Sequence, residues 1–333
     1  MLWVRVPSPA LKFYMIIAEE DICFHYFYWN TAGWNYRHSW VNFLFCCLAN
    51  RILYPNSKIY LFCYTEPDKQ LSYFSKILDF NIIYLQKTFL ETHEAAYRYV
   101  MDGSRHLLSK PIDSFNYAQK KLNKFVVLVD MDFFILDHLK DLRSDKVGVL
   151  FYEKNLCSNT GIITYFTKSK ITETWISLYK SMIAAMNISD KKLRKKIEFE
   201  AYRLDDSGFQ EEMVHKLIFL KFQEIVPDIF YDVGTENHSL YQPKVFRNYK
   251  RTLHLQQFNK HKIKDCLIRT KIFRKFLQLY NNKELYQYCI RYENTNLEEE
   301  EINLVNCLDS SFAEIEQINL RDHFKIEKPK IFM

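Results

Sequence analysis

The sequence is poor in the features that mark several common protein classes. Only 6 of its 333 residues are glycine, and no glycine-rich phosphate loop is present. Its 8 cysteines are scattered and form no Cys-x-x-Cys pair, which indicates free buried thiols in a reducing compartment and not a disulfide framework or a zinc site. No run approaches the ~18 continuous apolar residues of a membrane span. Internal repeats, low-complexity linkers and the signature of a Ser-His-Asp hydrolase are also missing.

The excess of positive over negative charge is small as well. The formal net charge of +6 is modest for a dedicated nucleic-acid binder, so we expect no nucleic-acid partner. Basic residues gather between His254 and Arg274, and acidic ones at 297–301, and two solvated helix faces are the simplest interpretation. Apolar residues, in contrast, make up 48% of the chain, which is enough for a sizeable core.

Short apolar runs separated by helical segments predict an α/β fold. A helix is predicted over residues 39–52, and another from about 170 to 187. Apolar runs that predict strands lie at 58–64, 80–85, 125–129, 147–152, 161–166 and 252–255. Nearly continuous runs of this kind are typical of a mainly parallel central sheet that is covered by helices on both faces.

We expect three segments along the chain. Residues 1–14 show no periodicity and too short an apolar stretch for a signal peptide, so they are predicted to be a non-native or disordered extension that precedes a true start at Met15. Residues 15–262 are predicted to form one α/β domain, and residues 263–333 a helical C-terminal extension.

The strongest apolar run, 125–129, stops at two aspartates, Asp130 and Asp132. Ligands of open α/β sheets bind beyond the carboxyl ends of the strands, which is where these residues lie. In extended backbone, alternation points both side chains to one side, and a hard divalent ion such as Mg²⁺ or Mn²⁺ would relieve their repulsion. The alternative is that one aspartate caps a following helix, since residues 136–142 have a helical pattern.

The segment Leu128-Val-Asp-Met-Asp-Phe-Phe-Ile-Leu136 resembles the D-x-D segment of GT-A glycosyltransferases, and further segments follow in the order of that family. Ser158-Asn-Thr-Gly161 is similar to the N-[ST]-G stretch that borders the donor sugar. Asp206-Ser-Gly-Phe-Gln-Glu-Glu212 is similar to the segment that reaches the reaction centre. His254-Leu-Gln-Gln-Phe-Asn-Lys260 keeps the H-x-x-G-x-x-K spacing of family 8 transferases.

This resemblance implies a GT-A-like, Rossmann-like fold for residues 15–262 and a set of site residues. It implies that Asp130, Asp132 and His254 hold Mn²⁺ or Mg²⁺. It also implies that Asp130, Asn159, Gly161 and Lys260 bind a nucleotide-diphosphate sugar, and that Asp206, Gln210 and Glu211 are the catalytic residues.

The chain departs from the family pattern in three places. Gln257 stands where the family has glycine, and His261 where it has proline. The segment 206–212 lacks the family's Asp-Gln-Asp, so the choice of catalytic residue among Asp206, Gln210 and Glu211 stays open, as does retention or inversion at the sugar.

The resemblance extends to bacterial surface-glycan transferases, which implies a glycan or glycolipid acceptor in surface polysaccharide or lipopolysaccharide synthesis. We therefore expect a cytoplasmic protein. The basic, aromatic segment 260–280 is a candidate for peripheral contact with the inner face of the membrane, and the alternative is an ordinary packed helix with a solvated face.

Two other functions remain open. A hydrophobic strand that ends in Asp-x-Asp is also the nucleophile motif of haloacid-dehalogenase-like phosphatases, but that motif normally opens its domain, and the small residue usual after the second aspartate is here Phe133. The departures at Gln257 and 206–212 leave room for a catalytically degenerate protein that binds a sugar or nucleotide.

Overall fold

The computed structural model describes most of the α/β core and parts of the C-terminal region. The described residues are 17–29, 40–93, 105–122, 124–135, 138–139, 142–152, 157–186, 192, 210–233, 237–239, 252–254, 268–291, 299, 302–303, 305–306 and 309. The backbone alone is described for 151–152, 157–160, 210, 237–239, 252–254 and 272.

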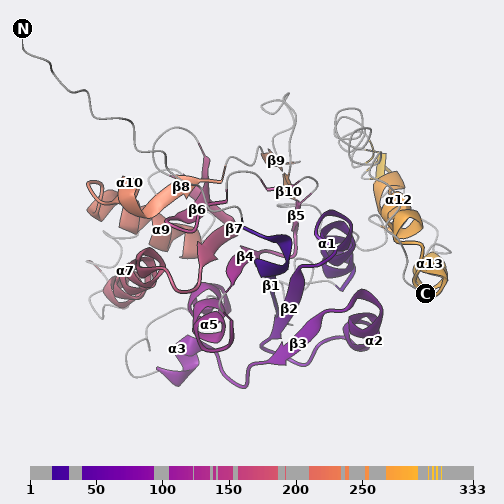
Figure 1. Ribbon diagram of the computed structural model, residues 1–333, viewed down its shortest axis with the longest axis horizontal. Helices are drawn as coiled ribbons and strands as arrows, with labels where there is room; N and C mark the ends of the chain where they lie inside the picture. Colours follow the sequence, from indigo (N-terminus) through magenta and orange to yellow (C-terminus); the bar gives the residue numbers. More distant parts are fainter. Residues whose placement is uncertain are drawn as a thin grey trace, which may run out of the picture.

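A seven-stranded mixed sheet forms the centre of the molecule (Figure 1). In spatial order its strands are β3 (Asn81–Tyr84), β2 (Lys58–Cys63), β1 (Ile22–Tyr28), β4 (Phe125–Val129), β7 (Cys157–Phe166), β6 (Val147–Tyr152) and β8 (Phe230–Asp232). The pairs from β3 to β4 are parallel, as is β6 with β8, whereas β7 runs antiparallel to both of its neighbours. The predicted mixed, mainly parallel sheet is therefore confirmed.

A small sheet continues from the end of β4. It consists of β5 (Phe133–Ile135), β10 (Thr252–His254) and β9 (Asn237–Ser239), with β10 in the middle. Strand β10 runs antiparallel to β5 and parallel to β9. Strand β5 follows Asp132 directly, so the alternative in which an aspartate caps a helix does not hold for residues 133–135.

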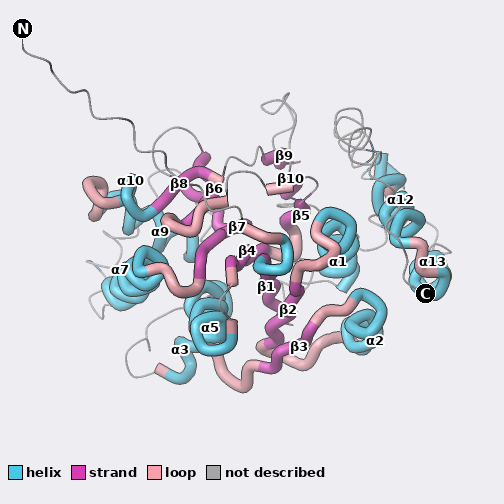
Figure 2. The backbone as a smooth tube through the Cα atoms, viewed as in Figure 1, coloured by secondary structure: helices cyan, strands magenta, loops and turns pink. Residues whose placement is uncertain are grey.

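Helices cover both faces of the large sheet (Figure 2). One core contains α1 (Trp40–Leu53), α2 (Lys69–Leu78), α12 (Lys271–Tyr280) and α13 (Lys283–Ile290). The other contains α3 (Phe89–Thr92), α5 (Arg105–Lys121), α7 (Lys170–Met186), α9 (Gln210–Lys221) and α10 (Val226–Ile229). Along β1, Phe24 and Tyr26 face the first core and Cys23 and Phe27 the second, which is the alternation expected of a strand buried on both faces.

The apolar face of α12 packs against α1. Phe273 and Phe276 are buried, with ring centroids 5.7 and 5.3 Å from that of Phe45. Tyr280 donates a hydrogen bond of 2.9 Å to the carbonyl of Ile77 in α2. In the described part of segment 260–280, the packed-helix alternative therefore matches the structure, because these aromatic side chains lie in the core.

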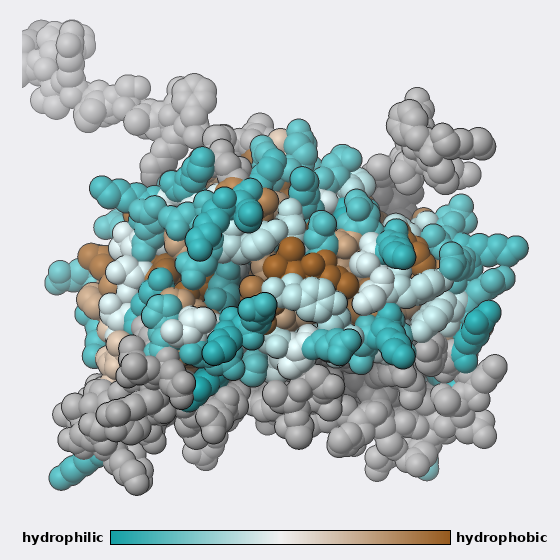
Figure 3. Space-filling view, turned by 90° about the horizontal axis from the view of Figure 1, so that it is seen from below, coloured by the Kyte–Doolittle hydropathy of each residue, from teal (hydrophilic) through white to brown (hydrophobic). Residues whose placement is uncertain are grey.

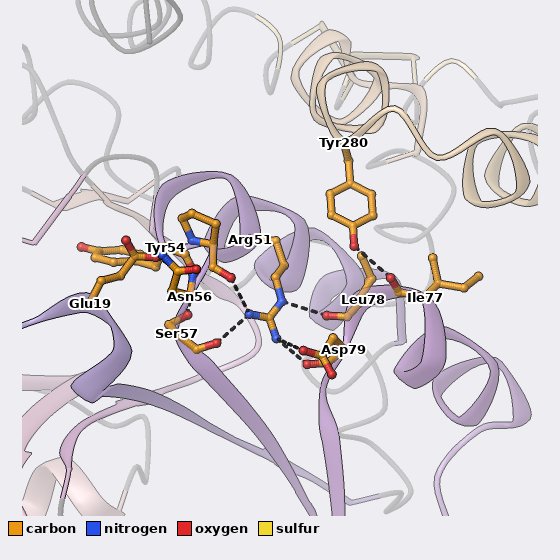
Figure 4. A network of polar contacts seen from close by, with 10 residues as sticks. Glu19, Arg51, Tyr54, Asn56, Ser57, Ile77, Leu78, Asp79 and Tyr280 are labelled. Atoms are coloured by element: carbon orange, nitrogen blue, oxygen red, sulfur yellow. Dashed lines mark hydrogen bonds and ion pairs between the residues drawn. The ribbon is translucent and has the colours of Figure 1, made fainter. Parts of the chain in front are cut away.

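Arg51 of α1 ties together the turn before β2 and the end of α2 (Figure 4). Its guanidinium donates to the carbonyls of Ser57 at 2.6 Å and Leu78 at 2.8 Å, and also to those of Pro55 and Asp79. Asp79 ends α2 in the left-handed conformation, at φ 51°. The guanidinium of Arg51 thus acts as the donor for several carbonyl groups at the ends of helices and strands, where backbone partners are missing.

Strand β3 forms one edge of the large sheet. Tyr84 is 61% exposed, and Ile82 and Ile83 are half-buried. Figure 3 shows apolar surface near the middle of the face seen from below, the side on which β3 lies in Figure 1.

Most predicted elements agree with the structure to within a few residues, including α1, α7 and the strands β2, β3, β4 and β6. Strand β7 begins at Cys157 and so starts earlier than the predicted run at 161. Five cysteines, Cys23, Cys46, Cys47, Cys63 and Cys289, are buried free thiols, as predicted. No helix in the described ranges is both long and apolar enough to cross a bilayer.

Candidate functional site

The acidic end of β4 is held between two neighbouring elements. The amide of Asp130 donates to the carbonyl of Gly161 on β7 at 2.9 Å, so these two predicted site residues are adjacent. The amide of Phe133 donates to the carbonyl of Asp130 at 3.0 Å, which closes a turn over residues 130–133. The prediction that Asp130 and Asp132 point to one side was argued from extended backbone, whereas the chain turns here into β5. That the two side chains point to one side therefore stays a prediction.

Asp132 lies inside this turn, and only 3% of it is exposed. Helix α1 supports the turn, since the thiol of Cys46 lies 3.6 Å from the carbonyl of Met131 and 3.8 Å from that of Phe133. Burial raises the pKa of Cys46, and Cys47 and the nearby carboxylate of Asp132 raise it further. Asp132 is therefore a buried carboxyl group beside Cys46 at the site.

His254 comes to the same place from far along the chain. Strand β10 pairs with β5 so that His254 lies opposite Phe133, the residue after Asp132. The backbones of the three predicted metal ligands thus meet at the turn after β4. The side chain of His254 is outside the described residues, and the side chains that are described contain no cluster of three potential metal ligands.

A lysine that the sequence did not single out completes the charged site. Lys110 of α5 has a side chain only 4% exposed, and its ammonium contacts the carboxylates of Asp130 and Glu211, the latter at 2.9 Å. Burial disfavours its charged form, but the two carboxylates outweigh this effect and raise the pKa of Lys110. The group is therefore a permanent positive charge between two predicted site residues. Its only sequence signal is a lysine among buried positions of one helix, Leu107, Leu108 and Ile112.

Glu211, a predicted catalytic residue, lies in the first turn of α9 and is 4% exposed. The pKa of Glu211 is raised to about 7. Burial is the largest cause of this rise, Asp130 adds to it, and Lys110 opposes it. One turn later, Nδ1 of His215 lies 3.1 Å from the carbonyl of Glu211, and the indole of Trp175 donates to its Nε2 at 3.2 Å. This arrangement requires a neutral imidazole, and burial lowers the pKa of His215 to about 4. The first turn of α9 is thus fixed against α7, with Glu211 directed at Lys110.

The other predicted site residues are only partly tested. Asn159 lies on β7 opposite Leu150, and Gln210 is the first residue of α9, but the side chains of both are outside the described residues. Asp206 and Lys260 lie outside the described residues altogether. Their assignment to the site stays a prediction.

A second group of residues that the sequence did not reveal lies at the carboxyl ends of β1 and β2. The rings of Trp29 and His106 stack with centroids 5.6 Å apart, and Tyr64 lies 5.1 Å from His106. Tyr64 donates to Asp113 at 2.9 Å, as does the amide of Phe89 at 3.1 Å. Burial raises the pKa of Asp113 to about 6. His106, Lys110 and Asp113 are spaced so that they share one face of α5. This face of the helix therefore contacts both the second group and the charged site at Asp130 and Glu211.

Glycosyltransferases are among the solved structures that resemble the chain, whereas no family model and no curated protein sequence matches it. Mouse xyloside xylosyltransferase 1, in its apo form, is 10% identical with a TM-score of 0.43, over 71% of this chain and 97% of that one. The apo form of the glycosyltransferase GlyE of Streptococcus pneumoniae TIGR4 is 11% identical with a TM-score of 0.44, over 81% of this chain and 64% of that one. A glycosyltransferase involved in the glycosylation of the major capsid of PBCV-1 is 10% identical with a TM-score of 0.36, over 73% and 96%.

These likenesses are distant, so we base the function on the residues of this chain. Nothing among them singles out family 8. The mixed, mainly parallel sheet with helices on both faces is the architecture that the resemblance in the sequence implies.

Proposed function

We propose that the chain is a metal-dependent glycosyltransferase that moves a sugar from a nucleotide-diphosphate sugar to a glycan or lipid-linked acceptor. The observation that carries this proposal is the turn after β4, where Asp130 lies beside Gly161 and Asp132 precedes Phe133, the residue that pairs with His254. Predicted site residues from three separate stretches of sequence meet at the carboxyl end of one strand, which is where open α/β sheets bind their ligands.

The donor groups at this turn fit a hard divalent cation. Two carboxylates and an imidazole suit Mn²⁺ or Mg²⁺. We assign Asp130, Asp132 and His254 to holding the ion. When bound, such an ion neutralises the charge of a diphosphate leaving group.

The protein's own charges have separate tasks in this proposal. Lys110 is a fixed cation beside Asp130, and with Lys260 it stabilises the negative charge that develops on the departing diphosphate. Asn159 and Gly161 border the donor sugar. Glu211, which Lys110 holds in place, is the described member of the proposed catalytic set and accepts hydrogen bonds from sugar hydroxyls, with Asp206 and Gln210 beside it in sequence.

The wider proposals concern the acceptor and the place of work. We propose a role in surface-glycan synthesis in the cytoplasm, within a catalytic domain of residues 15–262. Contact with an anionic membrane through segment 260–280 would have to use the exposed side of α12, where Lys271 and Arg274 lie, because Phe273 and Phe276 are in the core.

The phosphatase alternative is less well supported by the sheet. Asp130 follows the fourth strand of the chain, after β1, β2 and β3 have all entered the same sheet, whereas the phosphatase motif normally opens its domain. A degenerate binding protein remains the second candidate, because of the departures at Gln257 and in segment 206–212.

Calorimetric titration tests the proposal. UDP, GDP, ADP and CDP are titrated with and without MnCl₂ into the wild type, Asp132→Asn and the control Asp228→Asn, which changes an exposed aspartate on α10. We expect one nucleotide to bind only with Mn²⁺, and Asp132→Asn alone to abolish this binding. Binding of none of them to the wild type would refute the proposal. Metal-dependent binding without any turnover of the matching nucleotide-sugar would favour the degenerate binding protein.

A further inference from the structure

Helix α5 brings Lys110 into the site, and the helix lacks one backbone hydrogen bond at this point. Pro111 follows Lys110 inside the helix and has no amide hydrogen to donate to the carbonyl of Leu107. Contacts with the rest of the fold must therefore set where this part of the helix lies. Apolar packing alone is weakly directional, so hydrogen bonds decide the axial position of a helix on a sheet more sharply.

A buried chain of three polar side chains provides such contacts one turn after Lys110. The hydroxyl of Ser114 lies 2.8 Å from Nδ1 of His25 and 2.6 Å from the hydroxyl of Tyr165. All three residues have no exposed surface. The imidazole is neutral, since burial lowers the pKa of His25 to about 3.

The strands that carry this chain explain its position. His25 is on β1 and Tyr165 on β7, and these are the two neighbours of β4 in the sheet. Ser114 thus ties α5 to both strands that flank β4, the strand that ends at Asp130. The same hydrogen-bonded chain that holds the helix therefore fixes Lys110 relative to Asp130.

We propose that His25, Ser114 and Tyr165 are positioning residues that place the Lys110 ammonium between Asp130 and Glu211. This inference rests on the proposed function for its effect on turnover, but the contacts that carry it do not involve the metal or the donor. Loss of the Ser114 hydroxyl lets α5 shift along the sheet, and a shift of about 1 Å at a catalytic group costs on the order of a hundredfold in rate.

A matched control is available on the same helix. Ser109 is equally buried, but its hydroxyl accepts a hydrogen bond of 3.2 Å from the amide of Leu90 in α3, not from the central sheet. Ser109→Ala and Ser114→Ala therefore remove the same group from the same helix and differ in whether the sheet loses its contact.

The experiment is a double-mutant cycle. Ser114→Ala, Tyr165→Phe and Ser109→Ala are each made in the wild type and in Lys110→Met, with Lys110→Gln as a second background if Lys110→Met does not fold. Folding is checked by circular dichroism. The affinity for UDP, GDP, ADP and CDP with MnCl₂ is measured first, followed by kcat and KM for the nucleotide-sugar that matches the nucleotide bound.

We expect Ser114→Ala and Tyr165→Phe to lower kcat at least about tenfold in the wild type, with a smaller change in KM, and less than about twofold in the Lys110→Met background. Ser109→Ala should change kcat less than about twofold in both backgrounds. If Ser114→Ala does not fold, Tyr165→Phe tests the positioning role alone, because it removes the hydroxyl that contacts Ser114 but keeps the packed ring.

Equal effects in both backgrounds, or an equal effect of Ser109→Ala, would overturn the positioning role, since a general loosening of the fold does not depend on Lys110. A wild type that binds none of the four nucleotides would instead refute the proposed function, and the positioning role would fall with it.

Discussion

Replacement of Lys110 by methionine is the sharpest test of the buried charges. The substitution keeps the length of the side chain but removes an ammonium that contacts Asp130 and Glu211. The side chains of Lys110 and Glu211 are only 4% and 5% exposed, so Glu211 is left as a buried charge without its counterion. Removal of one partner from a buried ion pair typically costs about 3–5 kcal/mol, and we expect a loss at the lower end, about 3 kcal/mol at pH 8.

The loss should depend on pH with a definite sign. Burial raises the pKa of Glu211 in the folded protein to about 7, from an ordinary value of 4.5, and Lys110 opposes this rise. Without Lys110 the pKa of Glu211 in the folded protein rises further. The stability that is present below the pKa of Glu211 in the unfolded protein is lost as the pH rises through its pKa in the folded protein. The difference in unfolding free energy between wild type and Lys110→Met is therefore expected to be larger at pH 8 than at pH 6.

Urea unfolding at both pH values measures this difference. The control is Lys124→Met, which breaks an ion pair with Asp21 whose side chains are 26% and 51% exposed. Such exposed pairs contribute about 0.2–1 kcal/mol, with little change between pH 6 and 8. Equal losses in the two variants, or a loss in Lys110→Met that grows toward pH 6, would refute the placement of Lys110 as a buried counterion.

Three further substitutions have effects that urea unfolding can check. Asp113→Asn should stabilise the protein by about 1–2 kcal/mol at pH 8, because burial raises the pKa of Asp113 to about 6, and this gain should vanish as the pH falls toward 4. Gly148→Ala should destabilise by about 1–3 kcal/mol, because a methyl group there meets Thr164, Tyr231 and Val233. Arg51→Met should cost about 3 kcal/mol, because it leaves several backbone carbonyls without their charged donor.

The central strands were predictable because burial on both faces leaves a continuous apolar run. Strand β4 was placed at its observed bounds, and the run stops at Asp130 in sequence as it does in the fold. Strand β1 was not predicted, although it reads Ile-Cys-Phe-His-Tyr-Phe-Tyr. Its one polar residue, His25, belongs in the core only because Ser114 lies beside it, which a local pattern does not show.

Short elements and long-range contacts were harder to predict. Strand β5 has three residues, and its partner β10 comes more than a hundred positions later, so the local pattern around residue 136 favoured a helix. Lys110 was missed for a related reason. Its partners lie 20 and 101 positions away in sequence, and the helix that carries it also contains a proline, which weakens a helical pattern.

The group formed by Asp130, Lys110 and Glu211 is a poor means of stabilisation, which argues that it has another purpose. Desolvation of three charges offsets much of their attraction, and apolar side chains of similar volume often stabilise a core as well or better. Here the three groups come from the end of β4, from α5 and from α9, and they meet at the carboxyl end of a strand, where open α/β sheets bind their ligands. Perturbed titratable groups with named charge partners in such a place are typical of functional sites. If Lys110 is purely structural, Lys110→Met should lower the stability, but the effect of Ser114→Ala on kcat should be the same in the wild type and in Lys110→Met. If Lys110 acts on the donor, the stability should fall and the effect of Ser114→Ala should also depend on the background.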